Sequence, residues 1–272
     1  NPASLEAAQR ATGAVCAAID AVMAGQAKNA FCAVRPPGHH AEPERSMGFC
    51  IFNSVAIGAQ HARAAHGLQR VAVVDFDVHH GNGTQAAFWD DGDLFYGSTH
   101  QMPLYPGTGA ASETGAGNIH NFPLAPGAAG IDFRDAVTDG LLPALDAFKP
   151  EFLLISAGFD AHADDPLAQL RLDTDDYTWV SRELLAVAAR HCLGWRSRGG
   201  FTRNGRPSNA EGCRLGLFAP HRLATLFHHD FPVLEHLGPA FFERGAQALC
   251  LLGVCFLEPL APFYPLGCIS VF

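Results

Sequence analysis

The chain has 272 residues, of which 48% are hydrophobic and 17% charged, a composition typical of a folded domain rather than an intrinsically disordered chain. Its formal net charge is −9, which argues against a general nucleic-acid binder or a protein of anionic membrane surfaces, since both need a basic footprint. No apolar run reaches the roughly 20 residues of a membrane-spanning helix. No signal peptide opens the chain, and the eight cysteines form no CxxC pair. We therefore expect a cytoplasmic protein in a reducing compartment.

Predicted helices and strands alternate along the first 192 residues. Ala and Leu dominate the first helix, Asn53 is placed to cap the second, and a valine-rich run from Val71 is typical of a strand covered on both faces. In chain order we expect a helix over 4–23, a strand over 29–34, a helix over 53–65, strands over 71–74 and 94–98, a helix over 135–148 interrupted at Pro143, a strand over 152–156 and a helix over 174–192. This order predicts the α/β class, a mostly parallel sheet with helices on both faces.

Residues 193–272 differ in character from residues 1–192. They contain seven Arg, no Lys and five acidic residues, and Pro or Gly interrupts nearly every apolar run. We interpret residues 1–192 as the α/β core. Residues 193–272 are then an atypical C-terminal segment, either read in a shifted frame or poorly ordered.

Polar clusters follow the predicted strands. They occupy residues 35–40, 75–83, 98–109 and 156–162. In open α/β sheets, ligands bind beyond the carboxyl ends of the strands, so these clusters are the candidate functional residues.

Asp77, His79 and Asp160 are candidate metal ligands. Asp77 and His79 are two positions apart, so on an extended backbone they project to the same side, and Asp160 could join them from another strand. Two carboxylates and an imidazole suit Zn²⁺ and leave one coordination position open for water. Mn²⁺ and Fe²⁺ would also accept this ligand set. The alternative is that Asp77 and His79 only cap the next helix.

The adjacent His39 and His40 are candidates for proton transfer beside a metal-bound water. Each needs a partner on its other ring nitrogen, and Asp75 and Asn82 are the candidates. A carboxylate partner would raise the pKa of its histidine, whereas an amide partner would leave the other nearer neutral. The pair would then divide into an electrostatic role and a base role.

The motifs RPPGHH, MGFCIFN, VDFDVHHGNGTQ, STHQ…YPGTG and SAGFDAHADDPLA resemble those of the zinc-dependent histone deacetylase family. That family includes acetoin-utilisation proteins and acetylpolyamine amidohydrolases. The resemblance covers about residues 1–192, and Asn82 within HHGNG is similar to the class II branch.

The resemblance implies one zinc ion per chain, held by Asp77, His79 and Asp160. It implies a tandem pair in which Asp75 orients His39 and Asn82 orients His40. His40 would act as general base and then as general acid. The remaining histidines, among them His61 and His66, are interpreted as surface or helix residues rather than ligands.

The resemblance also implies a narrow channel for the acyl-lysine stem. Phe49, after Gly48, would form one wall, and Tyr105 the opposing aromatic wall. A structural monovalent cation, usually K⁺, would lie among the backbone carbonyls and side chains of Asp75, Asp77, His79, Ser98 and Thr99.

Two departures from the family concern the ends of the chain. The family has an N-terminal strand and loop before the helix at Ser4, so we expect a fold incomplete at both ends. The family also supplies a tyrosine from a Gly-Gly-Tyr turn, whose hydroxyl helps to hold the oxyanion. Here Gly199-Gly200-Phe201 stands at about that position, and Phe201 has no hydroxyl.

The function expected from the resemblance is hydrolysis of acetylated lysine peptides or acetylated small amines such as polyamines, with release of acetate. One alternative is a non-catalytic or weakly active acyl-lysine-binding pseudo-deacetylase that lacks the tyrosine. A second is a dinuclear manganese ureohydrolase, which would need further Asp and His ligands. The sequence leaves the physiological substrate and homo-oligomerisation open.

Overall fold

The computed structural model describes residues 2–192, 254–256 and 267–271 of the chain. Its elements, in chain order, are α1 (Ser4–Met23), β1 (Ala30–Val34), α2 (Ser54–His66), β2 (Val71–Asp75), α3 (Asn82–Phe88), β3 (Leu94–Gln101), β4 (Ile119–Leu124), α4 (Gly130–Ala136), the π-helical turn η1 (Val137–Leu141), α5 (Leu142–Phe148), β5 (Phe152–Ala157), α6 (Thr174–His191), β6 (Val254–Phe256) and β7 (Gly267–Val271). None of the helices in these residues combines the length and apolar character needed to cross a membrane.

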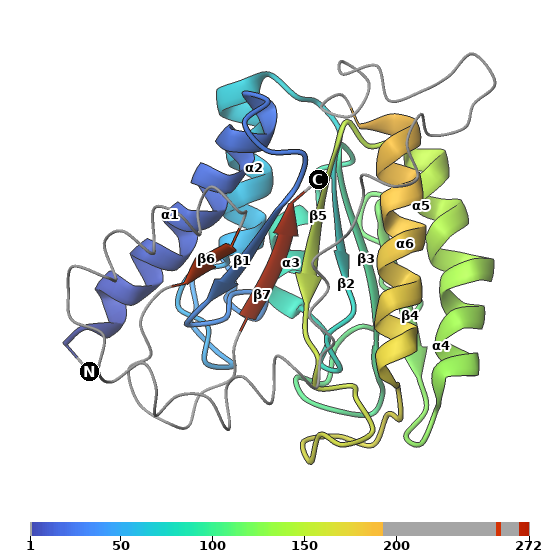
Figure 1. Cartoon of the computed structure of the whole chain (residues 1–272). Helices are drawn as coiled ribbons and strands as arrows, with labels where there is room; N and C mark the ends of the chain where they lie inside the picture. Colours follow the sequence, from blue (N-terminus) through green and yellow to red (C-terminus); the bar gives the residue numbers. More distant parts are fainter. Residues whose placement is uncertain (1, 193–253, 257–266, 272) are drawn as a thin grey trace.

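The described strands form one sheet in the order β4-β3-β2-β5-β7-β1-β6 (Figure 1). All neighbours pair in parallel except β7, which is antiparallel to both β5 and β1. The mostly parallel sheet predicted from the sequence is therefore confirmed. In the centre, Asp75 at the end of β2 pairs with Ser98 of β3 and Ser156 of β5, so these three strands carry their following loops to one edge.

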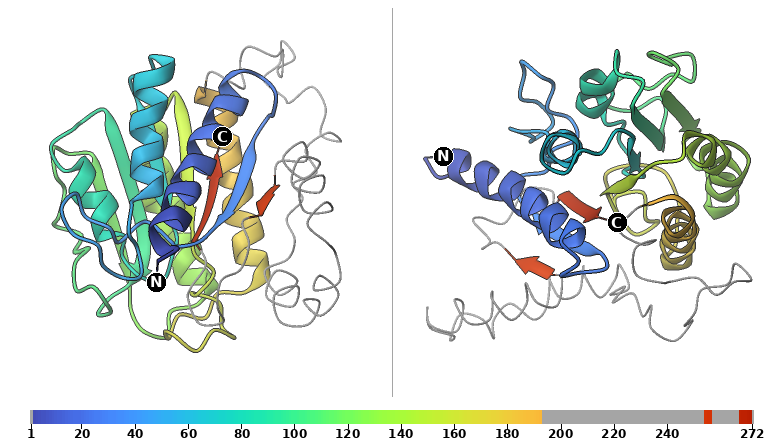
Figure 2. Two further views of the ribbon diagram at one scale, coloured as in Figure 1. Left: turned by 90° about the vertical axis from the view of Figure 1, so that its left-hand side faces the viewer. Right: turned by 90° about the horizontal axis from the view of Figure 1, so that it is seen from above.

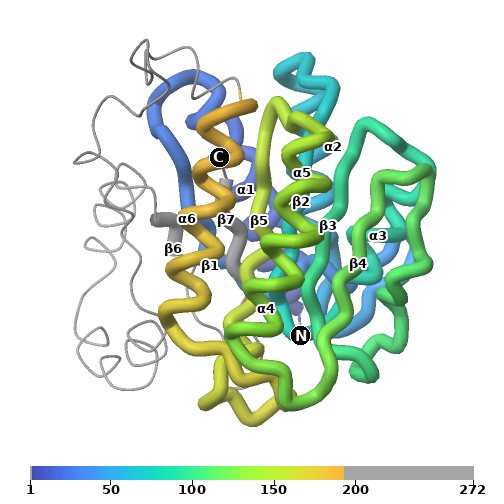
Figure 3. Tube along the Cα trace, turned by 90° about the vertical axis from the view of Figure 1, so that its right-hand side faces the viewer, coloured from blue at the N-terminus to red at the C-terminus, as the bar shows by residue number. Residues whose placement is uncertain are grey.

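Helices cover both faces of this sheet, as predicted (Figures 1 and 2). One face packs against α1, α2 and α3 through a core that includes Val15, Ala59 and Leu154. The other face packs against α4, α5 and α6, which lie in front in Figure 3, through a core that includes Leu145 and Leu153. Neighbouring β5 residues thus face opposite cores, because side chains alternate along a strand.

Local signals in the sequence set several helix ends. The Asn53 side chain accepts a hydrogen bond from Ala56 N (3.0 Å) and caps α2 as expected. Gly67 ends α2 with a φ of 69°, in the left-handed region that favours glycine. Asp173 caps α6 by accepting from the backbone N–H groups of Asp175 and Asp176.

Within residues 1–192, the structure differs from the predicted elements in three places. The helix expected from Asp135 begins at Gly130 and is divided by η1, and Pro143 lies in the first turn of α5, directly after η1. The short α3 was not predicted, because its seven residues carry little periodicity. The strand β4 was also missed, because it contains His, Asn and Pro at positions that reduce the strand signal. The proposed division at residue 192 falls largely outside the described residues.

Candidate metal centre and active site

Asp77, His79 and Asp160 come together beyond the carboxyl ends of β2 and β5. His79 Nδ1 lies 3.1 Å from Asp77 Oδ1 and 2.9 Å from Asp160 Oδ2. One ligand atom from each side chain lies within 4.8 Å of the other two. The close approach depends on Gly158 after β5, because a Cβ at that position would collide with the Asp77 carboxylate.

The route by which Asp77 and His79 meet differs from the expected one. Strand β2 ends at Asp75, and residues 77–79 form a bend rather than extended backbone. The bend is held by a hydrogen bond from His79 N to Asp77 Oδ1 (2.8 Å). A second backbone donor, Val78 N, bonds Asp160 Oδ1 at 2.9 Å and ties the two loops together.

The electrostatics of this cluster fit a divalent cation. Burial and the nearby Asp77 carboxylate raise the pKa of Asp160 to about 6. Burial would lower the pKa of His79, but hydrogen bonds to Asp160 and Asp77 outweigh it and raise that pKa to about 10. Two partly buried carboxylates thus share one imidazole, and their residual negative charge favours a cation. Carboxylate and imidazole are ligand types that Zn²⁺ accepts, and three of them leave a coordination position open.

His39 and His40 stand beside this cluster and are both buried. Their rings lie 4.0 Å apart between centroids, and His39 Nε2 is 3.9 Å from Asp77 Oδ2. His39 Nδ1 bonds Asp75 Oδ2 at 2.9 Å, and His40 Nδ1 bonds Asn82 Oδ1 at 2.9 Å. Both expected hydrogen bonds are therefore present.

The two histidines have opposite pKa shifts. Burial disfavours the charged form of His39, but the charges of Asp75 and Asp77 outweigh burial and raise its pKa to about 9. Burial and the charge of His39 lower the pKa of His40 to about 3. At neutral pH His39 is therefore cationic and His40 neutral, the division expected for a carboxylate partner and an amide partner.

Glu42 completes this arrangement and was not identified from the sequence. Its Oε1 accepts a hydrogen bond from Asn82 Nδ2 at 2.7 Å. Because a carboxylate only accepts, the NH₂ group of Asn82 must face Glu42, which leaves the amide oxygen for His40. His40 Nδ1 then carries the proton, and its Nε2 keeps a free lone pair.

Tyr96 is a second residue that the sequence reading missed. This fully buried side chain of β3 donates from its hydroxyl to Asp75 Oδ2 (3.4 Å) and accepts from Gly81 N (3.1 Å). A tyrosine inside a predicted buried strand was the available signal, since a buried hydroxyl needs a partner. Tyr96 helps to hold Asp75 against His39.

Tyr105 and Phe49, the expected channel walls, are both exposed, at 46% and 62%. The Tyr105 ring lies 5.1 Å from His40 and 6.4 Å from His79 between centroids, so it stands over the candidate site. Gly48 has a φ of 56°, and a Cβ there would collide with the His40 ring. The backbone before Phe49 therefore passes directly against His40.

A monovalent cation was expected among five residues, of which Ser98 and Thr99 belong to β3. Ser98 and Thr99 are buried in β3, and Ser98 lies in register with Asp75. Ser98 Oγ is hydrogen-bonded to His100 Nδ1 at 2.9 Å. No contact in the described residues tests the cation itself, and it stays a prediction. Phe201, the position of the missing tyrosine, lies outside the described residues.

The fold and these side chains define an α/β protein with a candidate metal centre at the carboxyl edge of a parallel sheet. The family model described as histone deacetylase domain matches residues 1–211. The chain therefore belongs to the histone deacetylase domain family.

Individual relatives agree with this assignment. The chain is 40% identical over 229 residues to the chloroplastic histone deacetylase 14 of Arabidopsis thaliana, covering 80% of this chain and 54% of that protein. It is 41% identical over 278 residues to the histone deacetylase-like amidohydrolase of Pseudomonas aeruginosa, covering 95% and 71%. The crystal structure of the HDA15 HD domain superposes with a TM-score of 0.64 at 39% identity, covering 68% of this chain and 54% of that one. The chain thus spans only about half of the Arabidopsis relative.

Proposed function

We propose that this chain is a zinc-dependent amidohydrolase that removes acetyl groups from acetylated lysine side chains or acetylated amines and releases acetate. The proposal is carried by one observation: Asp77, His79 and Asp160 converge within 4.8 Å directly beside the paired His39 and His40. Family membership supports the deacetylase or amidohydrolase class.

The side chains of this site divide the proposed reaction between them. A zinc ion held by Asp77, His79 and Asp160 would supply Lewis acidity toward the acetamide carbonyl. The free Nε2 of His40 would accept the proton of the attacking water and later donate it to the leaving amine. The cationic His39 would add positive charge where negative charge develops. Tyr105 and Phe49 would flank the acyl-lysine stem, and K⁺ would lie near Ser98 and Thr99 in a structural role.

Zinc content and turnover, measured for a variant of one proposed zinc ligand, test the proposal. The zinc-loaded chain is assayed for acetate release from an acetyl-lysine peptide and an acetylpolyamine, and for trifluoroacetate release from a trifluoroacetyl-lysine peptide. Asp160→Asn is expected to lose one zinc per chain and essentially all turnover. Asp164→Asn is the matched control, because that carboxylate lies on the same loop with a side chain 90% exposed, and it should retain both.

Three results would contradict the proposal. Zinc uptake that Asp160→Asn leaves unchanged would remove the metal site. Tight binding of acetyl-lysine peptide without hydrolysis of any of the three substrates would indicate an acyl-lysine-binding protein instead. Two manganese ions bound at this same cluster would indicate a ureohydrolase.

The variant Phe201→Tyr tests whether this chain lacks the tyrosine hydroxyl that would hold the oxyanion. The choice of position 201 rests on the sequence alone. Loss of one oxyanion donor typically costs about 10²–10³ in turnover. If residue 201 lies at the site, we expect the variant to hydrolyse acetyl-lysine peptide up to about 10²-fold faster. The activated trifluoroacetyl substrate should gain less, because it depends less on the donor. Equal gains or no gain would show that residue 201 does not serve the oxyanion.

A further inference from the structure

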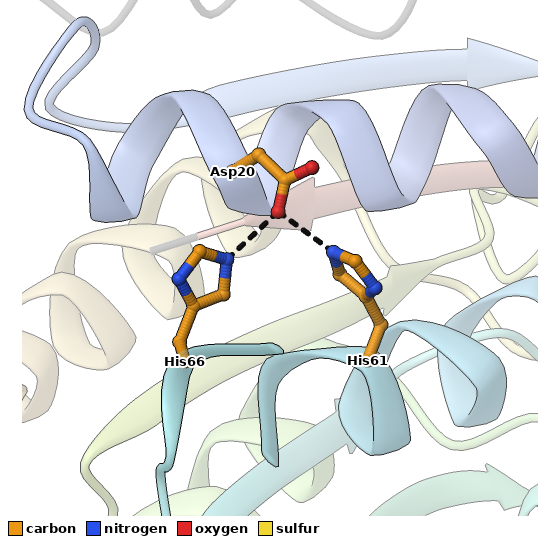
Figure 4. Close-up of side chains that lie close together, drawn as sticks. All are labelled: Asp20, His61 and His66. Carbon is orange, nitrogen blue, oxygen red and sulfur yellow. Dashed lines mark hydrogen bonds and ion pairs between the residues drawn. The ribbon is translucent and has the colours of Figure 1, made fainter. Parts of the chain in front are cut away.

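A second group of metal-ligand side chains lies between α1 and α2, away from the candidate active site. Asp20 is near the end of α1, and His61 and His66 belong to the last turns of α2 (Figure 4). Within the described residues, this trio and the Asp77 group are the two sets whose ligand atoms lie within 4.8 Å of one another. Asp20 precedes β1 in the chain and His61 and His66 precede β2, so the trio lies at the amino edge of the sheet, opposite the loops that carry Asp77.

The three ligand atoms converge on one point. His61 Nε2 and His66 Nε2 each lie 2.7 Å from the same oxygen, Oδ1 of Asp20. Figure 4 shows the two rings rising from α2 on either side of that oxygen. The two ring centroids are 5.8 Å apart, and the ring planes are nearly perpendicular, at 84°.

This convergence is a product of helix packing. His61 and His66 are five positions apart, about 140° around an α-helix, so α2 alone would not bring their rings together. Helix α1 approaches closely at Gly58, where a Cβ would lie 2.8 Å from Val15 Cγ1 and 3.1 Å from Ile19 Cδ1. Asp20 follows Ile19 and is thereby held between the two imidazoles. The ligand set is fixed by two packed helices rather than by a mobile loop.

The chemistry and exposure of the trio suit a borderline divalent ion. Two imidazoles and a carboxylate are ligands for Zn²⁺ and related transition metals, and three of them leave room for water. The side chains are 52% exposed for Asp20, 27% for His61 and 23% for His66, so an ion can enter from solvent.

We propose that Asp20, His61 and His66 form a second, surface metal site that binds Zn²⁺ or a related divalent transition metal and joins α1 to α2. Binding replaces the two Nε2–H donors by metal coordination, so each ring then keeps a single proton, on Nδ1. The bound ion stabilises the folded chain, because the unfolded chain does not hold the three ligands together.

Zinc stoichiometry and thermal stability test this site independently of the proposed reaction. The chain is equilibrated with Zn²⁺, and bound metal is counted for the wild type, His61→Gln, His66→Gln and Asp160→Asn. We expect two ions in the wild type and one in each variant. Loss of one imidazole should weaken the second site by at least about tenfold, and the Zn²⁺-dependent rise in Tm should shrink accordingly.

His191→Gln is the matched control. Its Nε2 bonds Asp146 Oδ1 at 2.9 Å, but within the described part of the chain the second group on that oxygen is the Arg190 guanidinium rather than another imidazole. This variant should bind as much zinc as the wild type. His61→Gln and His66→Gln should also keep wild-type deacylase turnover, and melting without metal checks that both fold.

The outcomes separate the two metal sites. One ion in the wild type and none in Asp160→Asn would overturn the second site and leave the proposed active site intact. One ion in the wild type and none in His61→Gln would support the second site and overturn the first. Unchanged zinc affinity in both His61→Gln and His66→Gln would also overturn the second site.

Discussion

At the scale of single residues, a short chain of hydrogen bonds fixes which ring nitrogen of the candidate base, His40, carries its proton. Glu42 orients the amide of Asn82, and the amide oxygen orients His40. Beside His39, burial is outweighed by the charges of Asp75 and Asp77, which raise the pKa of His39 to about 9. His39, with its carboxylate partner, is therefore charged, whereas His40 stays neutral because burial and the charge of His39 lower its pKa.

Replacing Asn82 by aspartate should make His40 behave like His39. Glu42→Gln is introduced with Asn82→Asp, since two carboxylates would otherwise face each other. A negative partner stabilises the imidazolium, so the pKa of His40 rises by about one to three units. A general base must be neutral to act, so the acidic limb of the kcat/KM profile should move to higher pH. Profiles against pH for an acetyl-lysine peptide measure the shift.

Glu42→Gln alone is the control for this change. It keeps an oxygen acceptor for the Asn82 amide, so its acidic limb should stay within a few tenths of a unit of the wild type. An unshifted limb in the double variant would show that His40 is not the group that titrates.

Gly48→Ala should impair the site through His40. The added Cβ would collide with the imidazole, and the positive φ of 56° adds strain of about 1–2 kcal/mol. We expect turnover to fall at least about tenfold, since a misplaced catalytic group can cost about 10²-fold. Gly67→Ala is the control, with a φ of 69° and nothing within 4 Å of the added carbon. It should lower stability similarly without lowering turnover; equal activity loss in both would point to strain alone.

At the scale of elements, short polar contacts connect the start of α2 to the loop that carries the histidines. Asn53 caps the helix, and its Nδ2 donates to Ala41 O (3.3 Å) and Thr84 Oγ1 (3.1 Å). The helix end and the loop after His40 are therefore held by one buried amide.

Asn53→Ala should reduce both stability and turnover. Loss of the cap and of the buried hydrogen bonds should lower the free energy of unfolding by about 1–3 kcal/mol. The loop at Ala41 would lose its support, so kcat should fall as well. Urea unfolding and steady-state kinetics measure the two effects. The control is Asp173→Ala, which removes another helix N-cap and should lower stability by about 1 kcal/mol while leaving kcat nearly unchanged. An Asn53→Ala variant with full kcat would show that Asn53 does not support the loop at Ala41.

At the scale of the whole molecule, the net charge of −9 favours cationic substrates. Long-range attraction of this kind raises association rates and is screened by salt, with a Debye length of about 10 Å at 0.1 M. An acetylated peptide rich in lysine and arginine should therefore be preferred at low ionic strength.

Added salt should lower kcat/KM for basic substrates more than for neutral ones. Between about 20 and 200 mM NaCl, kcat/KM for an arginine-flanked acetyl-lysine peptide should fall several-fold, because screening weakens its attraction. A glycine-flanked peptide serves as control and should change little. Parallel salt curves for the two peptides would show that the charge of the protein does not steer its substrate.

The sequence by itself determined the alternation of strands and helices, the parallel sheet, and the side chains that follow its strands. These are local signals: β-branched runs, the Asn53 cap, the Gly67 stop and the polar motifs after 71–74 and 152–156. Tertiary structure alone decided three things. The bend at residues 77–79, rather than strand alternation, brought Asp77 to His79, because backbone donors there bond carboxylates. Glu42 reached Asn82 across 40 positions. Asp20 met His61 and His66 because α1 and α2 pack closely, and a contact between helices distant in the chain leaves no periodic mark on either.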